Sequence, residues 1–185
     1  MGRKDDRDWE LGTQDEVAWI ADMTTVGPTI SSAIPPIFDA YATVVLPVEA
    51  EALEDHECRL MRLLEEAPGD RAWWLGYLDT GTDDVVFTDA PRVRLYAGWP
   101  YVLVKAGRLQ AQQWRADAAF TTHSRLPDLM FPADRTWLLS ALWDDDWWSL
   151  GGPRSLIDAF TRDPDLEVRE VTTDESATPP GHVSR

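Results

Sequence analysis

Cysteine and histidine are scarce in this sequence, which limits the sites that it can build. Cys58 is the one cysteine, so an intrachain disulfide and a zinc site built from cysteines are excluded. His56 lies two positions from Cys58 in an expected helix, and residues two apart on a helix point about 200° apart. These two side chains therefore cannot bind one metal ion together.

The motifs of several common enzyme classes are also absent. The sequence contains no G-x-S-x-G nucleophile elbow, no H-E-x-x-H metal motif and no G-x-G-x-x-G dinucleotide fingerprint. His123 stands beside Ser124, but no acidic residue can be assigned to orient such a pair. We therefore predict no cofactor and favour a protein that is not an enzyme, while catalysis stays open.

Long hydrophobic runs are missing from the chain. No apolar stretch approaches the roughly 18 residues that a membrane-spanning helix needs, and no signal-peptide hydrophobic region opens the sequence. The sequence thus predicts a cytoplasmic protein that has no contact with a membrane.

Positive charge is in short supply. Seventeen Lys and Arg residues stand against 33 Asp and Glu residues, which gives a net charge of −16. Nucleic-acid backbones and anionic membranes both attract a positive face, so we expect neither as a partner. Only Lys4 and Lys105 among the basic residues are lysines, and this preference for arginine is typical of a GC-rich bacterial genome. A basic protein is the partner that this charge favours.

Tryptophan, in contrast, is abundant, with ten residues in the chain. Tryptophan buries a large area in protein cores and is also enriched at the centres of binding interfaces. Trp73-Trp74 and Trp147-Trp148 are adjacent pairs, and neighbouring residues of a strand point to opposite faces of the sheet. Each pair is therefore either buried under two covered faces, or it leaves one indole available for binding.

The expected helices lie mainly in the N-terminal half. Thr13 and Glu16 fit a capping box, and apolar residues then recur at helical spacing. A continuous apolar stripe that stops at Pro68-Gly69 predicts the clearest helix over 49–67. Further helices are expected over 36–45, over 107–115 and after Pro153.

From residue 73 onward the pattern favours strands. Residues 92–97 alternate strictly between two faces, which is typical of an antiparallel sheet with one solvated face. The region 117–135 is expected to be an irregular loop. Other strands are expected at 73–79, 85–87, 101–106, 136–143, 147–150 and 166–171.

This order of elements predicts the α+β fold class. We expect N-terminal helices packed on one face of a mostly antiparallel sheet, followed by a late strand-helix-strand unit. Composition predicts a disordered N-terminus over 1–10, a single domain over 11–172 and a disordered tail over 173–185.

The strongest candidate site is an expected hairpin in which three consecutive aspartates are flanked by tryptophans. Three neighbouring carboxylates favour a turn, where Asp bonds the local backbone, and exposed indoles beside them would suit a partner that carries Arg or Lys. The candidate binding residues are Trp143, Asp144, Asp145, Asp146, Trp147 and Trp148.

Two functions are compatible with these residues. The favoured one is a non-enzymatic binding module for a basic protein partner, such as a protein that neutralises a cationic toxin or holds a regulator. The alternative is a metal-assisted hydrolase of a small phosphate or sugar, in which Asp144, Asp145 or Asp146 binds Mg²⁺ or acts as acid or base. No metal site is predicted in the favoured case, and a homodimer is not excluded in either.

Overall fold

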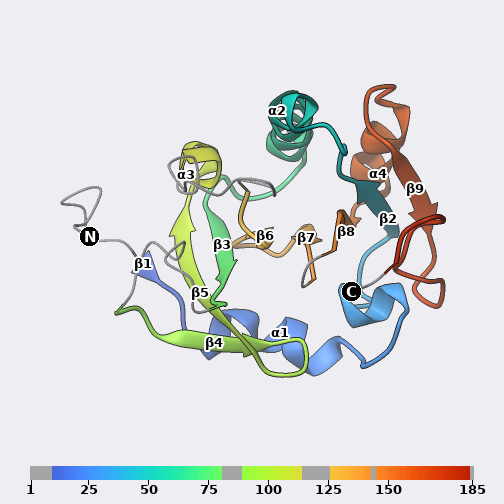
Figure 1. The fold of residues 1–185 in the computed structure, drawn as a ribbon. Helices are drawn as coiled ribbons and strands as arrows, with labels where there is room; N and C mark the ends of the chain where they lie inside the picture. The colour runs from blue at the N-terminus through green and yellow to red at the C-terminus, as the bar shows by residue number, and fades with distance from the viewer. Residues whose placement is uncertain (1–9, 81–88, 114–125, 143–144, 184–185) are drawn as a thin grey trace.

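A computed structural model describes residues 10–80, 89–113, 126–142 and 145–183, and gives only the backbone of Ala50 and Glu51. Within these residues, nine strands form one antiparallel sheet (Figure 1). Four helices and a short 3-10 helix accompany the sheet. None of the described helices is long and apolar enough to span a membrane. The elements are β1(Glu10–Leu11), α1(Gln14–Met23), η1(Ile30–Ser32), β2(Ala40–Val45), α2(Ala50–Glu66), β3(Trp73–Leu78), β4(Arg92–Leu95), β5(Trp99–Ala106), α3(Arg108–Gln113), β6(Leu129–Pro132), β7(Leu138–Ser140), β8(Trp147–Gly152), α4(Arg154–Arg162) and β9(Val168–Val171).

The sheet confirms the α+β fold class and carries the late strand-helix-strand unit. The strand order is β1-β5-β3-β6-β7-β8-β2-β9, and β4 adds to β5 beside β1. Strands β8 and β9 both pair antiparallel with β2, so they run parallel to each other on its two sides. Helix α4 makes the connection between them, as the sequence predicts.

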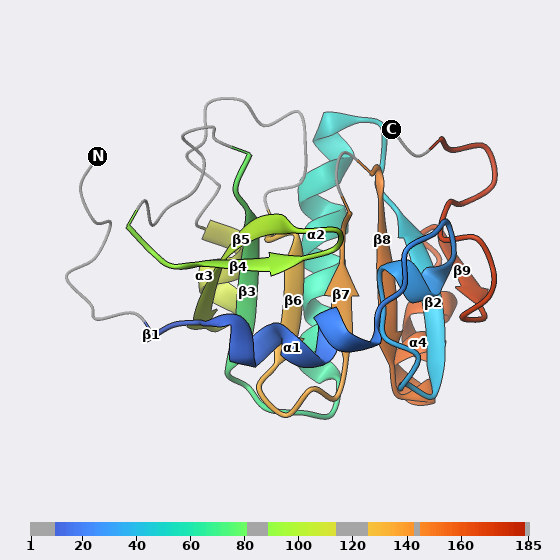
Figure 2. The same ribbon diagram turned by 90° about the horizontal axis from the view of Figure 1, so that it is seen from below.

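Helices cover both faces of the sheet, which differs from the expected one-face arrangement. Helices α2, α3 and α4 lie on one side, whereas α1 and η1 lie on the other with β4 (Figures 1 and 2). Two hydrophobic clusters separate accordingly, one with Leu60 and Phe160 and one with Val17 and Ile20. The physical reason is that the central strands carry apolar side chains on both faces, and each face needs a cover.

Strand β2 replaces the helix that was expected over 36–45, and this prediction is wrong. All six residues of β2 are buried between β8 and β9. A strand that is buried on both faces has a continuous apolar sequence. Some of its apolar residues are then also three or four positions apart by chance, which is the spacing that predicts a helix. The β-branched residues Thr43, Val44 and Val45 are well suited to a strand, because their side chains are stiff at χ1.

Strand β6 lies inside the region that was expected to be a loop. Leu129 to Pro132 pairs with β3 on one side and with β7 on the other. Four apolar residues between turns give too short a pattern to distinguish a strand from a loop. The strand expected over 85–87 lies outside the described residues.

The long helix and the capped helix follow their predictions. Helix α2 covers Ala50 to Glu66, and the capping box of α1 is present, with the Thr13 N–H donating to Glu16 Oε2 at 2.6 Å. The amide of Gln14 bonds both backbone groups of Arg94, since Nε2 donates to the Arg94 carbonyl at 3.0 Å and Oε1 accepts its N–H at 2.8 Å. Helix α1 thus holds β4 in place through one side chain.

The segment after β9 folds back over the α1–η1 connection. The N–H groups of Ile30 and Ser31 donate to the carbonyls of Glu175 and Thr173, and the Ala177 N–H donates to the Pro28 carbonyl at 2.8 Å. Within this segment, Ala177 is 7% exposed. These contacts continue past residue 172, where the sequence predicts the end of the domain, and the predicted disorder of 173–185 stays a prediction. Residues 1–9 lie outside the described part of the chain, and their predicted disorder stays a prediction.

Candidate functional site

The two described tryptophans of the predicted hairpin are buried in the protein. Trp147 is 2% exposed and Trp148 is 1% exposed. They lie on adjacent positions of β8, opposite Val45 and Val44 of β2, and so point to opposite faces of a sheet that is covered on both sides. Neither indole can contact a partner. The expectation that these rings form an exposed binding surface is wrong for Trp147 and Trp148.

The acidic residues of the hairpin separate into different surroundings. Asp146 is exposed, and its carboxylate lies 2.8 Å from Nδ1 of His182 in the C-terminal segment. Asp145 is partly buried, and its backbone N–H closes a turn by donating to the Leu142 carbonyl at 3.2 Å. Trp143 and Asp144 lie outside the described residues. The structure therefore does not present the six predicted residues as one surface.

Asp145 instead lines a hollow together with residues of other segments. The hollow has a volume of about 220 Å³ and lies between the α1–η1 connection, the β4–β5 hairpin and the β7–β8 connection. It brings an acidic side chain together with three aromatic ones. Its main lining residues are Val26, Ser32, Tyr96, Trp99, Tyr101 and Asp145.

The rim of the hollow carries apolar side chains that face solvent. Val26 is 94% exposed and Trp99 is 36% exposed, and both belong to the small group of large exposed hydrophobic residues among those described. Single exposed apolar residues are ordinary on protein surfaces. Two of them at the mouth of one hollow, beside a carboxylate, indicate a contact surface more than chance exposure.

The hairpin tip that supplies the aromatic residues has a strained backbone. Tyr96 and Ala97 have φ angles of +46° and +60°, in the left-handed region that disfavours residues other than glycine. The Gly98 N–H closes the turn by donating to the Leu95 carbonyl at 3.1 Å. A strained segment persists only where surrounding contacts hold it, and such segments concentrate at functional sites.

The hydroxyl group of Tyr96 supplies those contacts. It donates to the Ala33 carbonyl at 3.0 Å and accepts from the Ser140 hydroxyl at 3.0 Å. The ring is partly exposed, but the hydroxyl end lies inside the protein, and burial raises the pKa of Tyr96 above its usual value. The group therefore stays protonated and fixes the hairpin tip to η1 on one side and to β7 on the other.

Trp99 and Tyr96 line this hollow but are not among the residues that the sequence predicts for a site. Tyr96 lies at the end of the expected strand 92–97, and Trp99 lies between that strand and the expected strand 101–106. One feature of the sequence could have indicated them, because an indole in a turn has less chance of complete burial than one in a central strand. Their meeting with Asp145, however, joins residues that are more than 40 positions apart, and the sequence alone does not show it.

The described residues hold no group of three His, Cys, Asp or Glu side chains that could bind a metal ion.

Gly151 and Gly152, which precede α4, pack closely against other residues. A Cβ atom on Gly151 would lie 2.5 Å from Ile34 and Phe38, and one on Gly152 would lie 3.0 Å from Leu156. These glycines therefore let β8 approach its neighbours.

His56 is a buried titratable group on α2, outside the hollow. It is 6% exposed, and its Nε2 atom has no hydrogen-bond partner among the residues that the structure describes. Burial lowers the pKa of the imidazole below 6.5, and the nearby carboxylate of Asp163 acts in the opposite direction. The native state consequently holds His56 as a neutral side chain.

We expect His56 to weaken the fold in mild acid. Below about pH 6.5 the unfolded chain binds a proton at His56 more readily than the folded chain, so the free energy of unfolding falls as pH falls. His56→Gln should flatten this fall below about pH 6.5, by up to about 1.4 kcal/mol per pH unit. Urea denaturation over this pH range measures both slopes, and an unchanged slope in the variant would contradict the prediction.

Comparison with other proteins adds no further residue to this site. No protein-family model, no curated protein and no solved structure matches the chain. The hollow between Trp99 and Asp145 is thus assigned as the candidate site on its geometry alone.

Proposed function

We propose that this protein is a non-enzymatic binding module for a basic protein partner. The observation that carries the proposal is its charge. The chain has a net charge of −16, and most of the described basic side chains are already engaged with carboxylates of the same chain. Pairs of this kind neutralise the arginines and leave the acidic excess to act on the surroundings.

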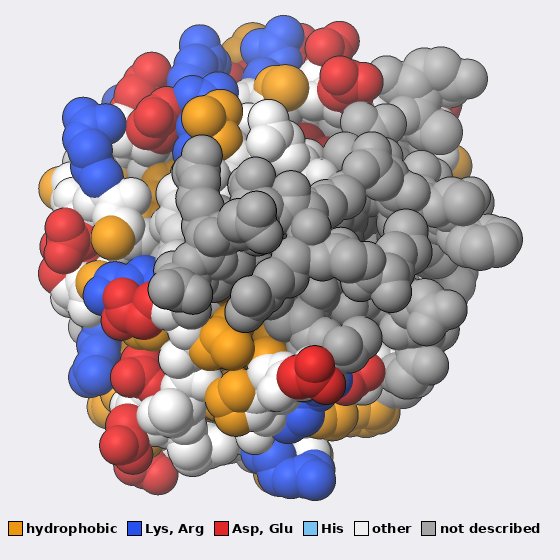
Figure 3. Space-filling model, turned by 90° about the vertical axis from the view of Figure 1, so that its left-hand side faces the viewer, with side chains coloured by type: hydrophobic (Ala, Val, Ile, Leu, Met, Phe, Trp, Pro, Cys, Tyr) orange, Lys and Arg blue, Asp and Glu red, His pale blue; other side chains and the backbone are white. Residues whose placement is uncertain are grey.

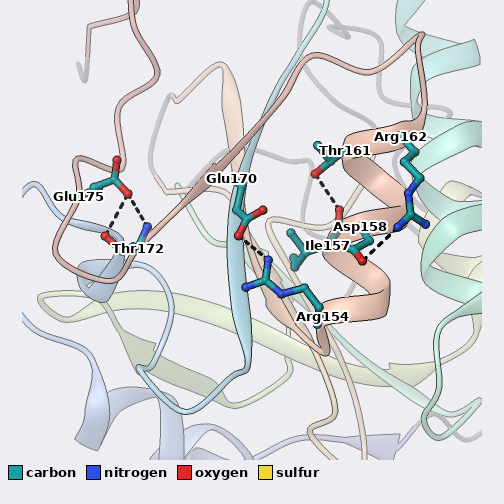
Figure 4. Close-up of polar contacts among 8 residues, drawn as sticks. All are labelled: Arg154, Ile157, Asp158, Thr161, Arg162, Glu170, Thr172 and Glu175. Atoms are coloured by element: carbon teal, nitrogen blue, oxygen red, sulfur yellow. Dashed lines mark hydrogen bonds and ion pairs between the residues drawn. The ribbon is translucent and has the colours of Figure 1, made fainter.

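The ion pairs near β9 illustrate this use of arginine. Arg154 at the start of α4 contacts Glu170 of β9, and Arg162 contacts Asp158 one turn earlier in the helix (Figure 4). Exposed pairs of this kind contribute little to stability, because water and salt screen them. They do remove basic groups from contact with an acidic or phosphorylated ligand, so the surface around them does not suit such a ligand.

The face that is shown in Figure 3 has the same character. Asp and Glu side chains lie next to Lys and Arg side chains around its described margin. Arg59, Arg62 and Arg108 line a shallow depression between α2 and α3, and each has a carboxylate partner in Asp163, Asp165 or Glu65. A positive site for phosphate would need these arginines unpaired.

The proposed role is capture of a basic protein, such as a cationic toxin or a basic regulator. Opposite charge accelerates the encounter of two proteins and selects between partners, while the contact surface supplies the remaining affinity. The hydrolase alternative gains no support from the described residues, which hold no triad of metal-binding side chains. It therefore stays a prediction from the acidic sequence around Asp145.

Binding to a basic probe should depend steeply on salt. We expect a fluorescently labelled hexa-arginine peptide to bind at about 0.01 M salt and to dissociate at about 1 M salt, since the Debye length falls from about 30 Å to about 3 Å. Fluorescence anisotropy measures this, with hexa-glutamate as the matched peptide of opposite charge. Failure of hexa-arginine to bind at low salt, or binding that is indifferent to salt, would contradict the proposed function.

A further inference from the structure

We propose that the hollow between Trp99 and Asp145 receives one cationic side chain of the basic partner, an arginine, a lysine or a methylated lysine. This inference rests on the proposed function and names the point of contact within it. The net charge of the chain does not indicate where on its surface the partner binds. The point of contact therefore has to be inferred from local geometry. Three independent features of the hollow support it.

The first feature is the chemistry of the walls. Tyr96, Trp99 and Tyr101 line the hollow together with Asp145. The face of an aromatic ring attracts a cation, and tryptophan does so most strongly. A carboxylate next to the rings adds a full negative charge and an acceptor for N–H groups. Aromatic rings and a carboxylate in one hollow suit an organic cation better than a neutral or acidic group.

The second feature is size. A volume of about 220 Å³ is below the roughly 300–1,000 Å³ of pockets that enclose a whole small molecule. It suits a single inserted side chain that belongs to a larger partner. The exposed Val26 and Trp99 at the rim then have a role, because they would contact the surface of the partner around the inserted side chain.

The third feature is rigidity. The strained turn at Tyr96 and Ala97 is fixed by the buried hydroxyl of Tyr96, which binds Ala33 and Ser140. The opposite wall is the α1–η1 connection, where the Thr25 N–H donates to the Ser31 carbonyl at 2.9 Å and the C-terminal segment bonds Pro28. Both walls are therefore held before a ligand arrives, which lowers the entropic cost of binding.

The test uses acetylated Gly-Arg-Gly, Gly-Lys-Gly and Gly-trimethyl-Lys-Gly peptides, with Gly-citrulline-Gly as the neutral counterpart of arginine. Titration calorimetry on the full chain measures affinity, and tryptophan fluorescence reports contact with the indoles. We expect at least one cationic peptide to bind and citrulline to bind at least about tenfold more weakly. Equal binding of citrulline would overturn the inference.

Variants of the hollow locate the binding. Trp99→Leu keeps apolar volume but removes the π face, and we expect it to weaken cation binding about 2- to 30-fold, whereas Trp99→Phe should retain most of it. Asp145→Asn should weaken binding about tenfold. Asp70→Asn changes the net charge equally at an exposed position away from the hollow, and it should have little effect.

The outcomes separate this inference from the proposed function. If hexa-arginine binds the wild-type chain in a salt-dependent manner but Trp99→Leu and Asp145→Asn bind it unchanged, the acidic surface captures the partner elsewhere and the inference is overturned. If hexa-arginine does not bind the wild-type chain at low salt, the proposed function itself fails. Circular dichroism of each variant confirms that a loss of binding does not reflect a loss of folding.

Discussion

Replacing Trp148 with alanine is expected to lower the free energy of unfolding by about 3–5 kcal/mol. The indole is 1% exposed and belongs to the hydrophobic cluster that joins β8 and β2 to the helices α2 and α4. Its removal deletes a large buried surface and leaves a cavity that the neighbouring β-strands cannot fill without breaking their pairing. Urea denaturation followed by circular dichroism measures the change.

Trp99→Ala is the matched control, because it removes the same side chain from a partly exposed position. We expect a smaller loss there, of about 1 kcal/mol, since less area returns to water. A loss of less than about 1 kcal/mol in Trp148→Ala would show that the indole is not a core residue. The original hypothesis of an exposed, indole-bearing hairpin would then regain support.

Tyr96→Phe is expected to cost about 2–3 kcal/mol of stability, although it removes a single oxygen atom. The Ser140 hydroxyl, in a residue that is 1% exposed, loses its acceptor, and the carbonyl of the fully buried Ala33 loses its donor. Buried polar groups without partners cost more than an ordinary hydrogen bond contributes. Without this anchor, the left-handed backbone at Tyr96 and Ala97 is also held less firmly.

A double-mutant cycle with Ser140→Ala separates these contributions. If the two hydroxyl groups stabilise the fold through each other, the double variant loses less than the sum of the single variants. Additive losses would mean that the bond between Tyr96 and Ser140 is not formed in solution. Thermal denaturation of the four chains provides the data, and a change below about 0.5 kcal/mol in Tyr96→Phe would contradict the anchor role.

Prediction from the sequence worked best where local rules and tertiary structure agree. The capping box at Thr13 and the stop at Pro68-Gly69 define α1 and α2 well, because caps and breakers act within a few residues of chain. The strict alternation in 92–97 likewise corresponds to β4. Each of these elements has one polar side, so polar and apolar residues repeat along its sequence with the period of a helix or a strand, and the element can be predicted from that repeat.

The same rules failed for strands that are buried on both faces. Strands β2 and β6 have no polar side, so their residues show no period of two, and β2 resembled a helix. The Trp147-Trp148 pair was ambiguous for the same reason, because its exposure depends on whether a second layer covers the sheet. On the Trp148 side that cover includes residues of α2 and α4, and on the Trp147 side the ring of His182 lies 6.1 Å from the indole, and only the packing of the whole chain brings these segments together.

The sequence by itself determined the charge of this protein, its fold class and the lack of a disulfide framework, because composition and local patterns are sufficient for those properties. The tertiary structure decided which indoles are buried, and it brought Trp99 next to Asp145. The physical reason is that a site is made by side chains distant in the sequence, and their approach depends on strand order and register. Strand order and register cannot be predicted from a local sequence pattern, so the candidate site could be identified only from the folded structure.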